Sequence, residues 1–187
     1  MKVEKTVLPE VVLLTRDIWR DMRGEFSESW QRDRYHDAGL PKDWAQDNVS
    51  HSTRHVLRGL HFQWPRPQGK LVSVLSGSVL DVAVDVRRDS PTFGQSVTVE
   101  LSAERGSQLY VPEGFAHGFS VLSREAVVHY KCTDFYVPVS ERTLLWNDPR
   151  LGICWPSGVP VLSSKDEAGL PLGDFAANEL PAIPKLP

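Results

Sequence analysis

The amino-acid sequence predicts a mainly β protein, an antiparallel sandwich or barrel with short peripheral helices. Turn residues recur at short intervals through the middle of the chain, and the segments between them alternate apolar and polar residues. That alternation is typical of half-buried strands. At least six such segments follow one another with short connections. Short connections favour antiparallel pairing, because parallel strands need a longer crossover between them.

The chain is predicted to form a single domain, residues 1–187, because this length suits one substantial core and is too short for two ordinary domains. We expect an N-terminal arm over about 1–45, a barrel core over about 46–146 and a C-terminal wrap over 147–187. In the arm, SWQRDRYHDAG (residues 29–39) predicts one short helix that Gly39 ends.

The clearest predicted strand of the core is SVLDVAVDV, residues 78–86. Its alternation puts Leu80, Val82, Val84 and Val86 on one face, and Asp81, Ala83 and Asp85 on the other. LSGS, at its start, predicts a hairpin turn. The other predicted strands are LRGLHFQ (57–63), SVTVELS (96–102), SQLYVP (107–112), FAHGFSVLS (115–123) and AVVHYKCTDFYVP (126–138).

The C-terminal wrap is predicted from its prolines, which preclude long regular elements. They stand at positions 156, 160, 171, 181, 184 and 187. SSKDEAG (163–169) predicts a second short helix with a serine cap and a glycine stop. We expect this tail to lie over the barrel, with its last ten or so residues loosely held.

Composition excludes several classes of function. Hydrophobic residues at 41% and charged residues at 24% are typical of a globular protein. The net charge of −3 gives no support for binding nucleic acid or an anionic membrane. MKVEKTVLPEVVLL fits neither a signal peptide nor a membrane span. Two cysteines, Cys132 and Cys154, form neither a disulfide framework nor a metal-ligand spacing. We therefore expect a cytoplasmic protein.

Three side chains could carry chemistry. His61 stands between the cations Arg58 and Lys70 in LRGLHFQWPRPQGK. In a regular strand, Arg58 would point away from the face that carries His61. His117, in GFAHGF, shares its face with apolar residues, so it points inward and needs a partner or a ligand. Tyr130 also points inward, and a phenol with a pKa near ~10 can donate a proton to an enolate. Each of the three has a plain alternative, a packed and hydrogen-bonded structural residue.

A metal site is not expected, because such a site usually needs three or more convergent ligands. Neither His61 nor His117 belongs to an H-x-H pair, and His51 and His55 lie in SHSTRH, which is interpreted as a loop. Nucleotide-binding glycine loops, the G-x-S-x-G elbow and C-x-x-C pairs are also absent from the sequence. No cofactor is expected.

An ordered set of motifs between about Val3 and Asp166 resembles the dTDP-4-dehydrorhamnose 3,5-epimerase family. The motifs are RGEFSESW, QDNVSHS, VLRGLHFQ, QGKLVSVLSGSVLDVAVDVRRDSPTFG, LSAE, VPEGFAHGFSVLS, YKCTDFYVP, WNDPRLGICWP and LSSKD. One such motif alone could occur by chance, whereas the set in this order is specific. The resemblance implies a cupin-type jelly roll that is metal-free and works as a homodimer on dTDP-4-keto-6-deoxyglucose, inverting C3 and C5 to give dTDP-4-keto-L-rhamnose.

The resemblance also implies roles for individual residues. His61 would be the base, supported by Asp166; Tyr130 would be the proton donor on the opposite face of the sugar; Lys70 would stabilise the enolate oxygen. The nucleotide-sugar site would be lined by Arg23, Glu28, Gln46, Asn48, Arg58, His117, Glu141 and Lys165. Because Arg58 is predicted to point away from His61, we expect it to bind the nucleotide at the barrel edge or across the dimer.

Alternatives stay open at this point. The enzyme could be a relative that inverts only C3 or only C5 of another dTDP-4-keto-deoxysugar. It could instead be a cupin that moves the keto group along the sugar or uses a metal for oxygen chemistry. A third alternative is a binding module on the same barrel, in which His61 and Tyr130 are structural.

Overall fold

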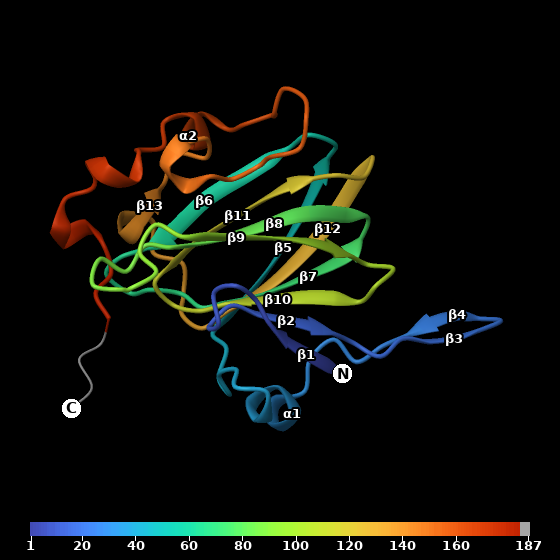
Figure 1. The fold of residues 1–187 in the computed structure, drawn as a ribbon. Helices are drawn as coiled ribbons and strands as arrows, with labels where there is room; N and C mark the ends of the chain where they lie inside the picture. Colours follow the sequence, from blue (N-terminus) through green and yellow to red (C-terminus); the bar gives the residue numbers. More distant parts are fainter. Residues whose placement is uncertain (184–187) are drawn as a thin grey trace.

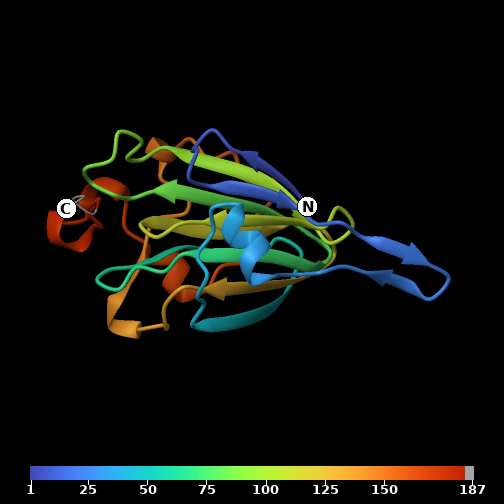
Figure 2. The same ribbon diagram turned by 90° about the horizontal axis from the view of Figure 1, so that it is seen from below.

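The computed structural model describes residues 1–183 and contains two antiparallel β-sheets that face each other (Figures 1 and 2). The first sheet has the order β1 (Lys2–Lys5), β2 (Val12–Thr15), β10 (Ser107–Val111), β7 (Lys70–Ser76), β12 (Glu125–Cys132) and β5 (Gln46–Thr53). The second has the order β13 (Glu141–Thr143), β6 (Leu57–Gln63), β11 (Phe115–Val121), β8 (Ser78–Asp85) and β9 (Ser96–Ser102). The predicted mainly β, cupin-type jelly-roll fold is confirmed.

Helices are few and peripheral. The two predicted ones are confirmed as α1 (Arg32–Asp37), followed by Gly39 with φ +92°, and α2 (Ser164–Glu167), capped by Ser163. Short 3₁₀ helices are η1 (Pro138–Ser140), η2 (Pro149–Leu151), η3 (Leu172–Asp174) and η4 (Ala177–Glu179). In residues 1–183, no helix is both long and apolar enough to cross a membrane.

The strand alternation produces two buried layers. Inward side chains of both sheets, among them Val72, Val128 and Phe119, form the core between the sheets. On β8 the inward face carries Val79 and Ala83, so Asp81 and Asp85 of the same face are buried too. The opposite face of β8, with Val82 and Val84, packs beneath the C-terminal wrap in a second core. Both faces of this strand are therefore covered.

Three local predictions are wrong. LSGS does not form a hairpin, because β7 belongs to the first sheet and β8 to the second. Gly77, with φ +78°, turns the chain from one sheet to the other, and a Cβ there would overlap the Glu125 carbonyl. His51 lies in strand β5 and not in a loop. In addition, β12 ends at Cys132, short of residue 138.

The C-terminal wrap crosses the outer face of the second sheet, drawn in orange and red in Figure 1. Its end is held more firmly than predicted: Leu180 is buried, and the Arg88 amide donates to the Pro181 carbonyl at 2.9 Å. Trp64 Nε1 donates to the Asn178 carbonyl at 3.0 Å. The prediction of loosely held residues is thus wrong for 178–181, and residues 184–187 lie outside the described part of the chain.

The N-terminal arm has two parts with different surroundings. Strands β1 and β2 extend the first sheet, and α1 packs on the outer face of that sheet through Tyr35, which contacts Leu71 and Tyr110. Between them, β3 (Trp19–Asp21) and β4 (Gly24–Phe26) form a hairpin that projects away from the two sheets (Figures 1 and 2). The hairpin leaves Trp19, Met22 and Phe26 exposed.

Candidate active site

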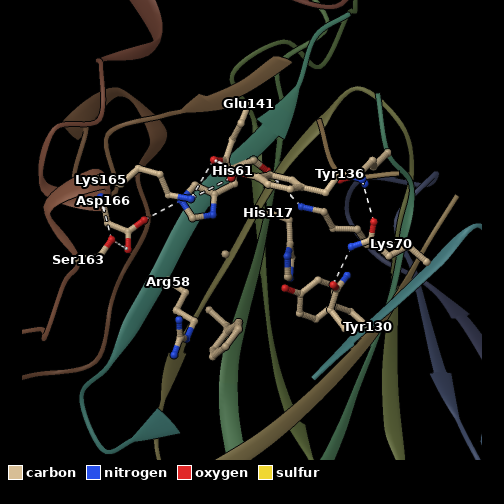
Figure 3. A pocket seen from close by; sticks show the side chains of 15 residues that line it. Arg58, His61, Lys70, His117, Tyr130, Tyr136, Glu141, Ser163, Lys165 and Asp166 are labelled. Carbon is tan, nitrogen blue, oxygen red and sulfur yellow. Dashed lines mark hydrogen bonds and ion pairs between the residues drawn. The ribbon is translucent and has the colours of Figure 1, made fainter. Parts of the chain in front are cut away.

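A cavity of about 330 Å³ opens at one end of the sandwich, and side chains from both sheets and from the C-terminal wrap line it (Figure 3). Its volume is within the range of small-molecule sites. Ten of the twelve predicted site residues line this cavity: Gln46, Asn48, Arg58, His61, Lys70, His117, Tyr130, Glu141, Lys165 and Asp166. Gly118 and Phe119 of β11 also line it.

His61 and Asp166 form a hydrogen-bonded pair. Asp166 lies on α2, which packs on β6, and its Oδ1 lies 2.7 Å from His61 Nε2. Since a carboxylate accepts hydrogen bonds, Nε2 carries the proton and Nδ1 has a free lone pair. Burial lowers the pKa of His61 below 6.5, while the hydrogen bond that His61 donates to Asp166 acts in the opposite direction. The imidazole is therefore neutral at neutral pH and able to accept a proton at Nδ1.

The Asp166 carboxylate is buried and has three donors. Oδ1 accepts from His61 and, at 3.3 Å, from the Gly59 amide; Oδ2 accepts from the Ser163 hydroxyl at 2.7 Å. Burial raises the pKa of Asp166, but the hydrogen bonds from His61 and Ser163 outweigh that effect, so the pKa lies below its ordinary value. The carboxylate is thus ionised and can stabilise an imidazolium.

Tyr130 and Lys70 come from the first sheet, on the side of the cavity opposite His61 (Figure 3). Burial raises the pKa of Tyr130 above 10, which keeps the phenol protonated at neutral pH. Burial lowers the pKa of Lys70, with Cys132, Glu141 and Asp81 acting in the opposite direction. Lys70 Nζ lies 3.4 Å from the His61 carbonyl, at the border between the two sheets. A base and a proton donor therefore face one cavity from two walls.

His117 has the inward orientation and the partner that the sequence required of it. It is 6% exposed, and its Nε2 lies 3.0 Å from both carboxylate oxygens of Asp81 on the neighbouring strand β8. A second buried histidine–aspartate pair thus stands beside the cavity. This hydrogen bond agrees with the alternative that His117 is a packed structural residue. Its ring nevertheless also lines the cavity.

Charged and polar groups gather at the mouth of the cavity. Lys165 Nζ contacts both carboxylate oxygens of Glu141, at 2.9 and 3.0 Å, and the Tyr136 hydroxyl donates to Glu141 at 2.9 Å. On the facing strand β5, Gln46 Nε2 donates to the side-chain oxygen Oδ1 of Asn48 at 2.8 Å. This rim offers cationic and amide groups to an anionic, hydrogen-bonding ligand.

The position of Arg58 differs from the one predicted. Arg58 lines the same cavity as His61, although regular alternation would turn it away. Strand β11 pairs His117 with His61 but Phe119 with Arg58, so two steps along β11 match three steps along β6. The extra residue of β6 is a β-bulge, and it returns Arg58 to the face of His61. The prediction that Arg58 points away from His61 is therefore wrong, while the place where it binds the nucleotide stays a prediction.

Arg23 and Glu28 do not line this cavity. Arg23 is at the tip of the β3–β4 hairpin, where it pairs with Asp21 at 2.6 Å. Glu28 pairs with Arg34 of α1 at 2.5 Å. Figure 1 shows the hairpin projecting from the body of the molecule, so one chain does not bring these two residues to its own cavity.

Sequence reasoning missed four side chains of the site: Gln68, Asp81, Tyr136 and Ser163. The alternation placed Asp81 opposite the face of Leu80, Val82 and Val84, so it gave no sign that the carboxylate is buried beside His117. Ser163 was assigned as a helix cap only. Tyr136 lies in a loop after β12, although the predicted strand over 126–138 included it, and that strand pattern gave it no role. Within residues 1–183, no group of three or more His, Cys, Asp or Glu side chains is arranged to hold a metal ion.

Comparison with known proteins gives a consistent result. Residues 5–174 match the family model described as dTDP-4-dehydrorhamnose 3,5-epimerase. The chain is 51% identical over 179 residues to the dTDP-4-dehydrorhamnose 3,5-epimerase of Salmonella typhimurium, covering 94% of this chain and 97% of the relative.

Solved structures agree. The dTDP-6-deoxy-D-glucose-3,5-epimerase of Legionella pneumophila in complex with dTDP-4-keto-L-rhamnose superposes with a TM-score of 0.94 at 49% identity, with 97% of each chain covered. A 3'-monoepimerase of Streptomyces bikiniensis in complex with dTDP-quinovose superposes with a TM-score of 0.88 at 34% identity, covering 95% of this chain and 92% of that chain.

Proposed function

Since the chain belongs to the dTDP-4-dehydrorhamnose 3,5-epimerase family, we propose that it epimerises dTDP-4-keto-6-deoxyglucose at C3 and C5 to give dTDP-4-keto-L-rhamnose. One observation carries this function beyond the family resemblance. The His61–Asp166 pair and Tyr130 face one cavity from opposite sheets. Inversion at carbon needs a base on one face of the sugar and an acid on the other, and this arrangement supplies both.

The first half of the reaction removes a proton next to the ketone. Nδ1 of His61 accepts the proton, and the Asp166 carboxylate stabilises the imidazolium that forms. Negative charge then develops on the C4 oxygen of the sugar. The Lys70 ammonium is placed to stabilise that oxyanion, a contribution that grows as the charge develops and so lowers the barrier.

The second half returns a proton to the same carbon from the opposite side. Tyr130 donates this proton, and burial keeps its phenol protonated until the carbanion forms. Because the C4 ketone acidifies both neighbouring carbons, the same base and acid can act at C3 and at C5. Which carbon reacts depends on how the sugar ring turns in the cavity.

The nucleotide part of the substrate carries permanent negative charge on its diphosphate. Arg58 and Lys165 offer cations to it, and Gln46 and Asn48 offer amide groups at the mouth of the cavity. Arg58 is itself oriented by Ser52, whose hydroxyl accepts from its Nε at 3.0 Å. These contacts hold the sugar over His61 without taking part in the chemistry.

The working unit is a homodimer in which the β3–β4 hairpin of each subunit reaches the cavity of its partner. Three facts support this part of the proposal. The hairpin projects from its own subunit, its Trp19, Met22 and Phe26 are exposed, and Arg23 lies away from its own cavity. Exposed aromatic and apolar side chains of this kind mark a surface that another chain covers. Arg23 and Glu28 would then line the partner's nucleotide-sugar site.

The test is incubation with dTDP-4-keto-6-deoxyglucose in D₂O, with deuterium at C3 and C5 followed by NMR. We expect exchange and inversion at both carbons. His61→Ala should abolish exchange, whereas Tyr130→Phe should permit exchange by the base but block inversion.

Each other outcome has a defined meaning. Exchange at one carbon only would make the protein a C3 or C5 monoepimerase. Movement of the keto group along the ring would indicate an isomerase. Binding of dTDP without any exchange would leave a binding module, and inversion by Tyr130→Phe would contradict the proton-donor role.

A further inference from the structure

Ser163 lies one contact behind the His61–Asp166 pair (Figure 3). Its hydroxyl donates to Asp166 Oδ2 at 2.7 Å and accepts from the Asp166 amide at 3.2 Å. One side chain therefore contacts both the carboxylate and the backbone of the residue that orients His61. Ser163 also lines the cavity, but the proposed mechanism gives its hydroxyl no contact with the substrate, and the sequence identifies it only as a helix cap.

The carboxylate of Asp166 needs such a contact. The terminal torsion of an aspartate is broad, so hydrogen bonds and not rotamer preference set the plane of the carboxylate. Two donors, His61 Nε2 and the Gly59 amide, both bind Oδ1. Ser163 is the donor to Oδ2 among the described residues. Without it, the carboxylate could turn about its Cβ–Cγ bond while keeping one oxygen near Gly59.

We propose that Ser163 is a positioning residue of the proposed epimerase reaction: it locks the plane of the Asp166 carboxylate, which in turn keeps His61 protonated at Nε2 and bare at Nδ1. The kinetic part of this inference rests on the proposed function. The part that concerns the imidazole tautomer does not, since it is a property of the protein without substrate.

A cap-only role is the competing explanation. Ser163 is the N-cap residue of α2, and loss of a cap lowers stability without any effect on chemistry. The two roles need different atoms. A cap needs an acceptor for the Asp166 amide, or simply a residue such as glycine that tolerates the cap position, whereas positioning needs a hydroxyl that donates to Oδ2.

Three substitutions at this position separate the roles. Ser163→Thr keeps both the cap and the donor, Ser163→Gly keeps most of the cap but has no donor, and Ser163→Ala loses both. Ser164→Ala is the matched control, because Ser164 is exposed and its hydroxyl has no hydrogen-bond partner in residues 1–183. All four variants and the wild-type enzyme are compared for kcat, KM and urea unfolding.

We expect kcat to fall about 10- to 100-fold in Ser163→Ala and Ser163→Gly, the size of effect that a misplaced catalytic group produces. KM should stay within about twofold, because the nucleotide contacts are unchanged. Ser163→Thr and Ser164→Ala should keep the wild-type kcat. If Ser163→Gly keeps the wild-type kcat, or if kcat falls only in proportion to lost stability, the cap explains Ser163 and the proposal is overturned.

The second readout is ¹⁵N NMR of histidine-labelled protein without substrate. Wild type, Ser163→Thr and Ser164→Ala should show His61 protonated at Nε2, whereas Ser163→Ala and Ser163→Gly should show a mixture of tautomers. A pure Nε2 tautomer in Ser163→Gly would overturn the proposal. If the wild-type enzyme does not epimerise the sugar, the proposed function fails, while this tautomer comparison still decides the role of Ser163.

Discussion

At the scale of single residues, the state of His61 results from two opposing effects. The imidazole lies 105 positions from Asp166 in the chain and 2.7 Å from it in space. Burial disfavours the imidazolium, and the neighbouring lysines Lys165 and Lys70 act in the same direction, whereas Asp166 favours it. The net effect is a pKa below 6.5, which favours the unprotonated base at neutral pH.

This balance predicts the pH dependence of the reaction. The base must be neutral, so kcat/KM of the wild-type enzyme should fall on the acid side with an apparent pKa below 6.5. Asp166→Asn removes the group that raises the pKa of His61. The acid limb should therefore move to lower pH, while kcat drops by about 10²-fold or more because the imidazolium loses its partner.

The measurement is a pH–rate profile of kcat/KM for both enzymes. Asp47→Asn is the control, since Asp47 pairs with Lys131 on the outer face of β5 and β12 and should leave the limb in place. An acid limb that moves to higher pH in Asp166→Asn would contradict the assignment of His61 and Asp166.

Sequence patterns predict residue types better than residue partners. The pattern identified His61, His117 and Tyr130 because a polar group among apolar residues needs a hydrogen-bond partner or a ligand. Asp81 stood on a face of a predicted strand, yet nothing local shows that this strand is the neighbour of β11. The His117–Asp81 pair and the Ser163–Asp166 contact arise only when separate segments meet, so neither could be derived from alternation alone.

At the scale of elements, the geometry of β6 decides what reaches the cavity. The bulge between Arg58 and His61 coincides with a close approach of β6 and β11, where two glycines, Gly59 and Gly118, meet. A Cβ on Gly118 would lie 2.6 Å from the Arg58 carbonyl and 3.1 Å from Gly59 Cα. Only glycine lets the two backbones approach this closely. The two glycines are therefore needed for the cation Arg58 and the base His61 to face the same cavity.

We therefore expect Gly118→Ala to harm both stability and binding. The added methyl group meets backbone atoms that cannot move aside, so the free energy of unfolding should fall by about 1–3 kcal/mol, as is typical of overpacking. If the strands separate, Arg58 shifts, and the affinity for dTDP should fall with it. Urea unfolding and calorimetric titration with dTDP measure the two effects, and a variant that keeps both would show that the bulge does not depend on this contact.

Element boundaries followed from the sequence where local chemistry sets them. The cap of Ser163, the stop at Gly39 and the alternation of residues 96–102 were each found in the structure. The turn at Gly77 was misinterpreted, because a tight turn looks alike whether it joins neighbours in one sheet or crosses between two. The bulge in β6 was missed for a related reason, since an extra residue is recognised only against the partner strand.

At the scale of the whole molecule, three distant parts of the chain build one site. The facing sheets bring His61 and Tyr130 to opposite walls, and the C-terminal wrap adds Lys165 and Asp166. The N-terminal hairpin is the part that stays away from the cavity of its own chain. A strand pattern describes the fold of one chain. It therefore cannot show which residues a second subunit would add to a site.

The proposed sharing of the site between two subunits predicts complementation between two inactive enzymes. Arg23→Ala damages only the hairpin, and His61→Ala damages only the body. In a mixed dimer, the body of the Arg23→Ala subunit and the hairpin of the His61→Ala subunit form one intact site. With random pairing, half of the dimers are mixed and each has one intact site of two, so activity should return to roughly a quarter of the wild-type value.

The two variants are coexpressed or refolded together, and epimerisation is measured at a substrate concentration below KM, where loss of an Arg23 contact has its full effect. Sedimentation of the same samples establishes that dimers are present. Mixing His61→Ala with Tyr130→Phe is the control, because both changes damage the body, every mixed site keeps one defect, and no activity should return. If dimers are present but the first mixture recovers no activity, Arg23 lies outside the partner's cavity. If the wild-type enzyme sediments as a monomer and is fully active, the reaction does not need a dimer.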